Sequence, residues 1–285
     1  MELGIGLPTM IPGVPGEDLL ASAVRAEELG FASLGVLDRL MYDGYEPLVT
    51  LAAAAGATRR IRLTTTILIA AYRADRSVLA KQLSSIDRLS GGRLVVGVAA
   101  GGRPDDFEAC DTPYERRGRR LDDLLDGLRR TWSGGPDPLN PGPSRSDGGP
   151  PLLVGGHTPQ AMRRAARFGV GWIAGGSSAS SYGDLADRAR QAWRDEGRTD
   201  RPRLVAIANV ALGPDAAERA ERFLLDYYGF LGWKAEIAVK GLITEPDQLR
   251  EFVDGYRAVG CDELILFPCV SEPGQVDEIA RVVLR

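Results

Sequence analysis

Short apolar segments alternate with amphipathic helical segments along the whole of this 285-residue chain, which limits the folds available to it. The apolar segments predict eight strands, at Leu3–Pro8, Ser33–Leu37, Ile61–Ile69, Leu94–Ala99, Leu152–Val154, Trp172–Ala174, Leu204–Leu212 and Glu263–Phe267. Helical spacing of apolar residues follows the strands, as in Glu17–Leu29 and Arg76–Leu89. Eight such units in one chain of this length favour a closed α/β barrel of the (β/α)8 type, one domain over residues 1–285, over an open doubly wound sheet.

Two segments interrupt the repeat, one after the fourth strand and one after the seventh. Ser133–Pro151 is rich in Pro, Gly and Ser, which predicts an exposed loop. Asp226–Glu245 is aromatic at first and then amphipathic. In a barrel it follows a strand on the side where loops form active sites, so it is either a lid or pocket wall, or a segment that packs in the core or in a dimer.

Reactive side chains are scarce. The chain has one histidine, His157, and its three cysteines occur in no C-x-x-C pattern: Cys110, Cys261 and Cys269. This excludes the usual zinc, iron–sulfur and haem motifs and favours the reducing cytosol over a disulfide framework.

Charge and hydropathy argue against nucleic-acid and membrane partners. The net charge is -4, and the densest basic cluster, Arg116–Arg120, precedes several aspartates on one predicted helix, as on a solvated helix face. The N-terminus has no signal-peptide pattern, and the longest uncharged run, Phe168–Gly183, is too short and too rich in Gly and Ser to span a membrane. We therefore expect a cytoplasmic protein.

One turn, Gly155-Gly156-His157-Thr158, has the pattern of a phosphate site. Thr158 is a good N-cap and Pro159 a good first helical residue, so the open amides of the next helix face the end of a strand. An ordinary capped strand-to-helix turn explains the same residues equally well. We expect His157 to hydrogen-bond phosphate or backbone rather than to act as a general base.

Two arginines follow strand ends, where barrel enzymes place functional groups. Arg39 is either a charge clamp for a ligand or the partner of Asp38 in a pair that orders a loop. Arg103, after Gly101 and Gly102, either reaches the same phosphate or is solvated. Cys269, beyond the last strand, is expected to be a small buried residue.

Several segments occur in an order that resembles the bacterial luciferase-like superfamily of flavin- and F420-dependent oxidoreductases. These segments are Gly4–Pro8, Leu34–Arg39, Ile61–Leu68, Leu79–Gln82, Asp87–Leu94, Gly97–Arg103 with Phe107, Pro151–His157 and Arg163–Arg167 with Gly171-Trp172. Leu-Ser-Gly-Gly-Arg-Leu and Gly-Gly-His-Thr-Pro are the most specific. The resemblance is strong as far as Gly176, weak from Ser177 to Val259 and moderate beyond.

The resemblance implies a (β/α)8 barrel, usually a homodimer, that holds FMN or F420 at the carboxyl ends of its strands. Residues 155–158 then form the phosphate cradle, with Gly101 and Arg103 beside it. It also implies a non-proline cis peptide at Thr66-Ile67, against the flavin ring. Many relatives have Asp-His where this chain has Asp38-Arg39.

Other relatives, the F420-dependent sugar dehydrogenases, place a Trp and a Glu where this chain has Met41-Tyr42 and Gly102. Their hydride-transfer acid and base are therefore absent here.

The sequence thus favours a monooxygenase that takes reduced FMN from a separate reductase, forms a flavin C4a-peroxide with O2 and oxygenates a small organic substrate, with Arg39 as its candidate catalytic residue. The alternatives are an F420-dependent reductase or dehydrogenase on the same scaffold and a flavin-binding protein without turnover. A flavin-free barrel lyase is least favoured, because the strand ends offer neither a lysine nor a pair of carboxylates.

Overall fold

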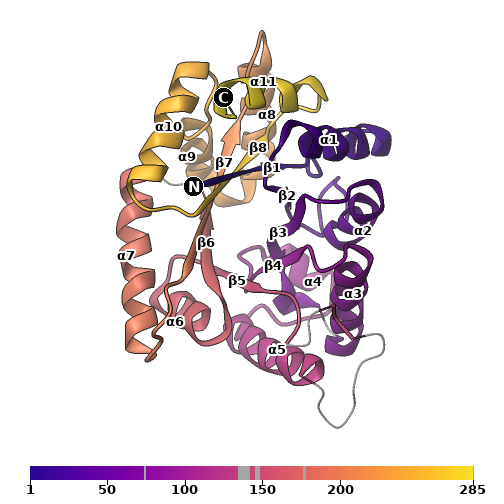
Figure 1. The fold of residues 1–285 in the computed structure, drawn as a ribbon, viewed down its shortest axis with the longest axis vertical. Coiled ribbons are helices and arrows are strands. Elements are labelled where there is room, and N and C mark those ends of the chain that lie inside the picture. The colour runs from indigo at the N-terminus through magenta and orange to yellow at the C-terminus, as the bar shows by residue number, and fades with distance from the viewer. Residues whose placement is uncertain (74, 134–141, 145–147, 176–177, 285) are drawn as a thin grey trace.

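All eight predicted strands are present in the computed structural model, which describes residues 1–73, 75–133, 142–144, 148–175 and 178–284, without the side chains of residues 233 and 234. They pair in parallel and in sequence order into a closed barrel, with β8 hydrogen-bonded to β1 (Figure 1). The strands are β1 (Glu2–Gly6), β2 (Ser33–Val36), β3 (Arg62–Ile69), β4 (Leu94–Ala99), β5 (Leu152–Gly155), β6 (Gly171–Gly175), β7 (Arg203–Val210) and β8 (Glu263–Pro268).

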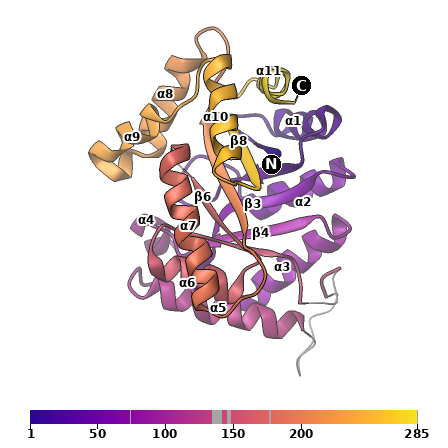
Figure 2. The same ribbon diagram turned by 60° about the vertical axis from the view of Figure 1, so that its left-hand side comes forward.

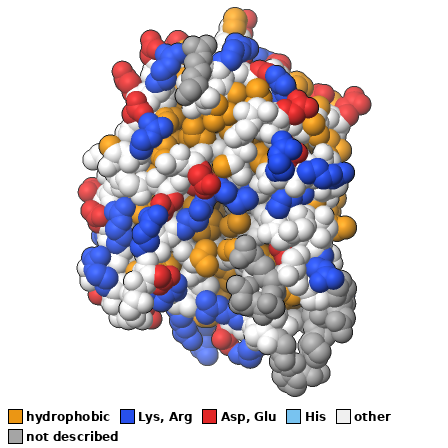
Figure 3. All heavy atoms as spheres, viewed as in Figure 1, with side chains coloured by type: hydrophobic (Ala, Val, Ile, Leu, Met, Phe, Trp, Pro, Cys, Tyr) orange, Lys and Arg blue, Asp and Glu red, His pale blue; other side chains and the backbone are white. Residues whose placement is uncertain are grey.

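Helices cover the outside of the barrel. They are α1 (Gly16–Leu29), α2 (Pro47–Ala57), α3 (Arg76–Leu89), α4 (Pro104–Glu108), α5 (Arg117–Trp132), α6 (Pro159–Phe168), α7 (Ala179–Asp195), α8 (Ala216–Tyr227), α9 (Ala235–Lys240), α10 (Pro246–Ala258) and α11 (Gly274–Val283), with the short 3-10 turns η1 (Ala70–Tyr72) and η2 (Gly229–Lys234). Positive and negative side chains are interspersed on the face shown in Figure 3.

The two expected insertions follow β4 and β7. The first, Ser133–Pro151, comes after α5 and lies largely outside the described residues. The second, Asp226–Glu245, begins at the end of α8 and contains η2 and α9; α8 and α9 lie together beyond the ring of helices (Figure 2). Among the described residues, no helix is long and apolar enough to cross a membrane.

Two apolar layers hold the barrel together. The larger lies between strands and helices, and the smaller fills the barrel with Leu153, Ile173, Val205, Ile265 and Phe267. A Cβ atom at Gly6 would overlap the Phe267 ring, so the glycine makes room for that ring. Cys269 is buried, as expected, and Cys110 and Cys261 are also free thiols.

A charged network closes the amino-terminal end of the barrel. Glu263 on β8 is buried and accepts hydrogen bonds from Ser33 at 2.5 Å, Arg203 at 2.8 Å and Arg62 at 3.2 Å. Glu2 on β1 pairs with the same two arginines and is more exposed. The network joins strands that are distant in sequence, at the end of the barrel where conserved charges usually serve stability rather than catalysis.

We expect Glu263→Ala to lower the free energy of unfolding by about 3 kcal/mol, because it leaves the buried Ser33 hydroxyl without its acceptor and removes the buried one of the two carboxylates that Arg62 and Arg203 share. Glu2→Ala is the matched control: its side chain is 42% exposed against 3% for Glu263, so its loss should cost less than about 1 kcal/mol. Urea denaturation measures both. Equal losses for the two variants would contradict this role of Glu263.

Candidate functional site

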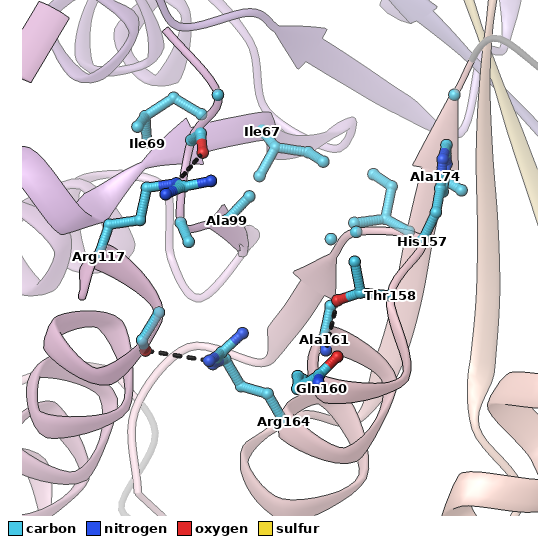
Figure 4. A pocket seen from close by; sticks show the side chains of 18 of the residues that line it. Ile67, Ile69, Ala99, Arg117, His157, Thr158, Gln160, Ala161, Arg164 and Ala174 are labelled. Carbon is cyan, nitrogen blue, oxygen red and sulfur yellow. Dashed lines mark hydrogen bonds between the residues drawn. The ribbon is translucent and has the colours of Figure 1, made fainter. Parts of the chain in front are cut away.

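A cavity of about 900 Å³ opens at the carboxyl ends of β3 to β7, on the side of the barrel where this fold places its active sites (Figure 4). Its floor is apolar and comes from the strand ends: Ile67, Ile69, Ala99, Ile173, Ala174, Ile207 and Ala208. Its polar wall comes from the β5–α6 turn and from α5 and α6. The cavity is large enough for a cofactor-sized ligand.

Glycines and a cis peptide lie at the floor of the cavity. The Thr66-Ile67 peptide is cis, as the family resemblance implied, and the β3–β4 register shifts between Thr65 and Leu68. A Cβ atom at Gly155 would lie 2.4 Å from Cδ1 of Ile67, so the glycine makes room for the end of that side chain. Gly101 lines the same cavity with φ +83°. A flat ring system fits such a surface without meeting side chains.

The Gly155–Thr158 turn lies on the wall beside this floor. Thr158 caps α6 by accepting a hydrogen bond from the N–H of Ala161 at 3.2 Å. The indole of Trp172 donates to the carbonyl oxygen of Gly156 at 2.8 Å, which holds the turn from below. Because Pro159 has no N–H, Gln160 supplies the first open amide of the helix to an anion in the cavity.

His157 is exposed to this cavity. The surrounding walls lower its pKa below the ordinary value of 6.5 because they reduce the hydration of the charged ring. The imidazole is therefore neutral at pH 7, and it can donate one hydrogen bond and accept another.

Two arginines that we did not select from the sequence line the cavity, Arg117 across it from the turn and Arg164 on the helix that follows the turn (Figure 4). Arg117, at the start of α5, donates to the carbonyl of Gly101 at 2.9 Å and stacks on Tyr114. Arg164, on α6, pairs with Asp122 at 2.5 Å. The basic cluster at 116–120 is thus partly a cavity wall and not only a solvated helix face. The aspartates that follow the cluster are typical of a solvated helix face, and the sequence does not show which side of α5 faces β5. The position of Arg117 in the cavity wall could therefore not be predicted from the sequence.

Arg103 does not line this cavity. It lies over the rings of Phe230 and Tyr227, at 3.8 and 4.4 Å, and donates to the carbonyl of Tyr227 at 2.9 Å. It lines a smaller cavity of about 150 Å³ that shares Ile67 and Ala99 with the large one. Arg103 is therefore neither a partner of the phosphate turn nor a solvated side chain.

Arg39 is held in the same region, with 10% of its side chain exposed. It pairs with Asp105 at 2.7 Å, contacts the Tyr227 carbonyl at 3.5 Å and lies over the ring of Tyr42. The expected pair with Asp38 is absent. Asp38 instead accepts hydrogen bonds from Tyr72, Ile69 and Arg73.

The segment that begins at Asp226 forms a pocket wall, one of the two alternatives that the sequence left open. Tyr227 lines the smaller cavity and Tyr228 the larger one. Tyr42 donates to Asp226 at 2.5 Å, so the loop after β2 also fastens this segment.

The described residues contain no cluster of three His, Cys, Asp or Glu side chains that could hold a metal ion.

These features fit a flavin. The glycine-lined apolar floor accommodates a flat ring, and the capped turn with two guanidinium groups accommodates a phosphate. Gly155, Gly156, His157 and Thr158 line the cavity at the turn, Ile67 and Gly101 line it at the strand ends, and Thr66 lines the smaller cavity.

Comparisons with known proteins agree with this geometry. A family model described as luciferase-like monooxygenase matches residues 1–275. An uncharacterized protein of Mycobacterium tuberculosis is 27% identical over 233 residues, which cover 70% of this chain and 79% of that protein.

Two solved structures share the fold. The monooxygenase RslO1 from Streptomyces bottropensis superposes with a TM-score of 0.79 at 24% identity, over 99% of this chain and 96% of that one. An F420-dependent secondary alcohol dehydrogenase in complex with an F420-acetone adduct superposes with a TM-score of 0.84 at 17% identity, over 99% and 98%. The chain is an oxidoreductase and belongs to the luciferase-like monooxygenase family.

Proposed function

We propose that this protein is an FMN-dependent monooxygenase, a homodimer that receives reduced FMN from a separate reductase and uses O2 to oxygenate a small organic substrate. One observation carries the choice. Asp122 is the only carboxylate among the described residues that line the large cavity, and Arg164 neutralises it. Oxygenation by a reduced flavin needs a dry, oriented site more than a protein acid or base.

Bound reduced FMN would supply the electrons and react with O2, and the chain's own residues would do the rest. Arg117, Arg164 and the Gly155–Thr158 turn would hold the phosphate. Ile67, Ala99 and Ile173 would press on the ring and exclude water from it. Neutral His157 would add a hydrogen bond at the phosphate end.

A second candidate is an F420-dependent reductase or dehydrogenase. An F420-dependent hydroxymycolic acid dehydrogenase of Mycobacterium tuberculosis, 29% identical to this chain over 188 residues, favours it. The two candidates differ in the cofactor that the cavity binds.

Equilibrium titration separates them: we expect FMN to bind more tightly than F420. Arg164→Ala should weaken FMN binding by about 10- to 100-fold, the range for a lost charge-assisted hydrogen bond, and leave riboflavin binding unchanged. Arg163→Ala, an exposed neighbour on α6 outside the cavity, is the matched control. Tighter binding of F420 would favour the second candidate, and equal effects on FMN and riboflavin would contradict the phosphate assignment.

Reoxidation of the flavin tests the reaction itself. With reduced FMN and air but no substrate to oxygenate, the protein should delay the appearance of oxidised FMN, and the release of hydrogen peroxide with it, behind the consumption of O2. Stopped-flow absorbance and an oxygen electrode record the two signals. Simultaneous signals at the rate of free reduced FMN would argue against a monooxygenase.

We propose that Arg39 is a positioning residue, which holds the Asp226–Phe230 segment over the cavity. Arg39→Ala should increase amide hydrogen exchange in residues 226–230 by about tenfold or more and leave FMN affinity within about twofold, since Arg39 lines neither cavity described above. Arg201→Ala, which removes an exposed pair with Asp262, is the control. Unchanged exchange in this segment would refute the role, and a large loss of FMN affinity would instead place Arg39 at the cofactor.

A further inference from the structure

A second chamber lies beside the proposed flavin cavity. It measures about 540 Å³ and is lined by residues at the end of β7, in α9 and in the first half of α10. Its walls are mostly apolar and include Leu231, Ile237, Ile243 and Phe252. This volume is in the range of sites that enclose small organic ligands.

The two spaces meet along one short border. Ile207, Ala208, Asn209 and Tyr228 line both of them. A molecule in the chamber would therefore touch the same strand end as a ring system in the large cavity. These four residues would separate the two molecules. The border is where two bound molecules would come closest.

The border residues are held rigidly. The carbonyl of Asn209 accepts a hydrogen bond from the N–H of Ile243 at 3.1 Å. The N–H of Ala211 donates to the carbonyl of Ile243 at 2.9 Å, so Ile243 pairs with the chain on both sides of Val210. Tyr228 ends α8, and its ring meets that of Tyr227 edge-on at 4.9 Å. The backbone at Asn209 and the ring of Tyr228 are therefore both fixed to the insertion.

Tyr228 lines both spaces, so its phenol can reach a ligand in either one. Burial raises the pKa of this phenol, which therefore keeps its proton at neutral pH. A protonated phenol can donate one hydrogen bond to an acceptor on a ligand.

Charge is nearly absent from the chamber. Among the described residues that line it, none is a carboxylate, and the cation Lys240 is exposed at its rim. A charged ligand would lose its hydration without gaining a partner inside, whereas an apolar ligand would gain by leaving water.

We propose that this chamber is the substrate site and that Tyr228 is a specificity-determining residue: the substrate is an uncharged, largely apolar molecule with one carbonyl-type oxygen that accepts a hydrogen bond from the Tyr228 hydroxyl. That bond places the carbon next to the oxygen at the border with the flavin cavity. The assignment rests on the proposed function only in naming the ligand a substrate.

Two probes that differ in one carbonyl group, 1-tetralone and tetralin, test the role of Tyr228. Each probe is titrated into the FMN-loaded protein, and tryptophan fluorescence measures its binding. Tyr228→Phe keeps the ring and removes the donor. It should weaken tetralone binding about fivefold, the effect of one neutral hydrogen bond, and leave tetralin binding unchanged. An equal change for both probes, or no change for either, would overturn the role of Tyr228.

A second variant tests the chamber without touching the border. Ile237→Asp puts a charge on the chamber wall and should weaken both probes tenfold or more. Val49→Asp makes the same change at a residue of α2 that is 70% exposed and lies outside the chamber, and should change neither. Equal behaviour of these two variants would overturn the chamber as the binding site.

The same titrations without flavin separate this inference from the proposed function. A protein that binds tetralone through Tyr228 but binds neither FMN nor F420 would retain the chamber and refute the monooxygenase. FMN binding without any Tyr228-dependent preference would refute the chamber and leave the monooxygenase standing.

Discussion

Closure of the barrel between β8 and β1 is the constraint on which the rest of the molecule depends. Four residue pairs, from Glu2 opposite Glu263 to Ile5 opposite Leu266, join the two ends of the sheet. Closure leaves no sheet edge, and it brings the carboxyl ends of eight strands, spread over more than 260 residues of sequence, onto one rim. Ile67, Gly155 and Asn209 meet around one cavity for that reason alone.

The two ends of the barrel divide stability from binding. At the amino-terminal end, Glu2 and Glu263 share Arg62 and Arg203, so each buried charge has a partner. At the carboxyl end, the strands finish in small or apolar residues, and charge is confined to the surrounding loops and helices. A flat apolar floor with a charged wall suits a ligand that has a ring at one end and a phosphate at the other.

Arginines outside the cavity serve a different purpose from those inside it. Arg39 and Arg103 come from the loops after β2 and β4, and both reach the carbonyl of Tyr227 at the end of α8. A terminal helix carbonyl has no partner within its helix, so two guanidinium groups satisfy it and fasten the insertion to the barrel. The cavity wall made by Tyr228 thus depends on contacts between three loops that are far apart in sequence.

Much of this architecture could be predicted from local sequence. Strand and helix periods, the Thr158 cap and the glycines of the turn are properties of neighbouring residues, because hydrogen bonding and side-chain periodicity act over a few positions. The eight strands and the place of residues 155–158 beside the cavity follow from such patterns. The cis Thr66-Ile67 peptide came from family resemblance and not from a local signal.

Pairings across the fold could not be predicted in this way. Asp38 and Arg39 are adjacent in sequence yet bind different partners, because neighbouring side chains leave the chain in different directions and meet whatever the fold places there. The inward position of Arg117 and Arg164 and the meeting of Asn209 with Tyr228 likewise depend on how helices pack against the barrel. The sequence by itself determined the repeating units and the capped glycine turn at residues 155–158. Only the tertiary structure decided which arginines face the cavity, because that choice depends on long-range packing and not on the residues nearby.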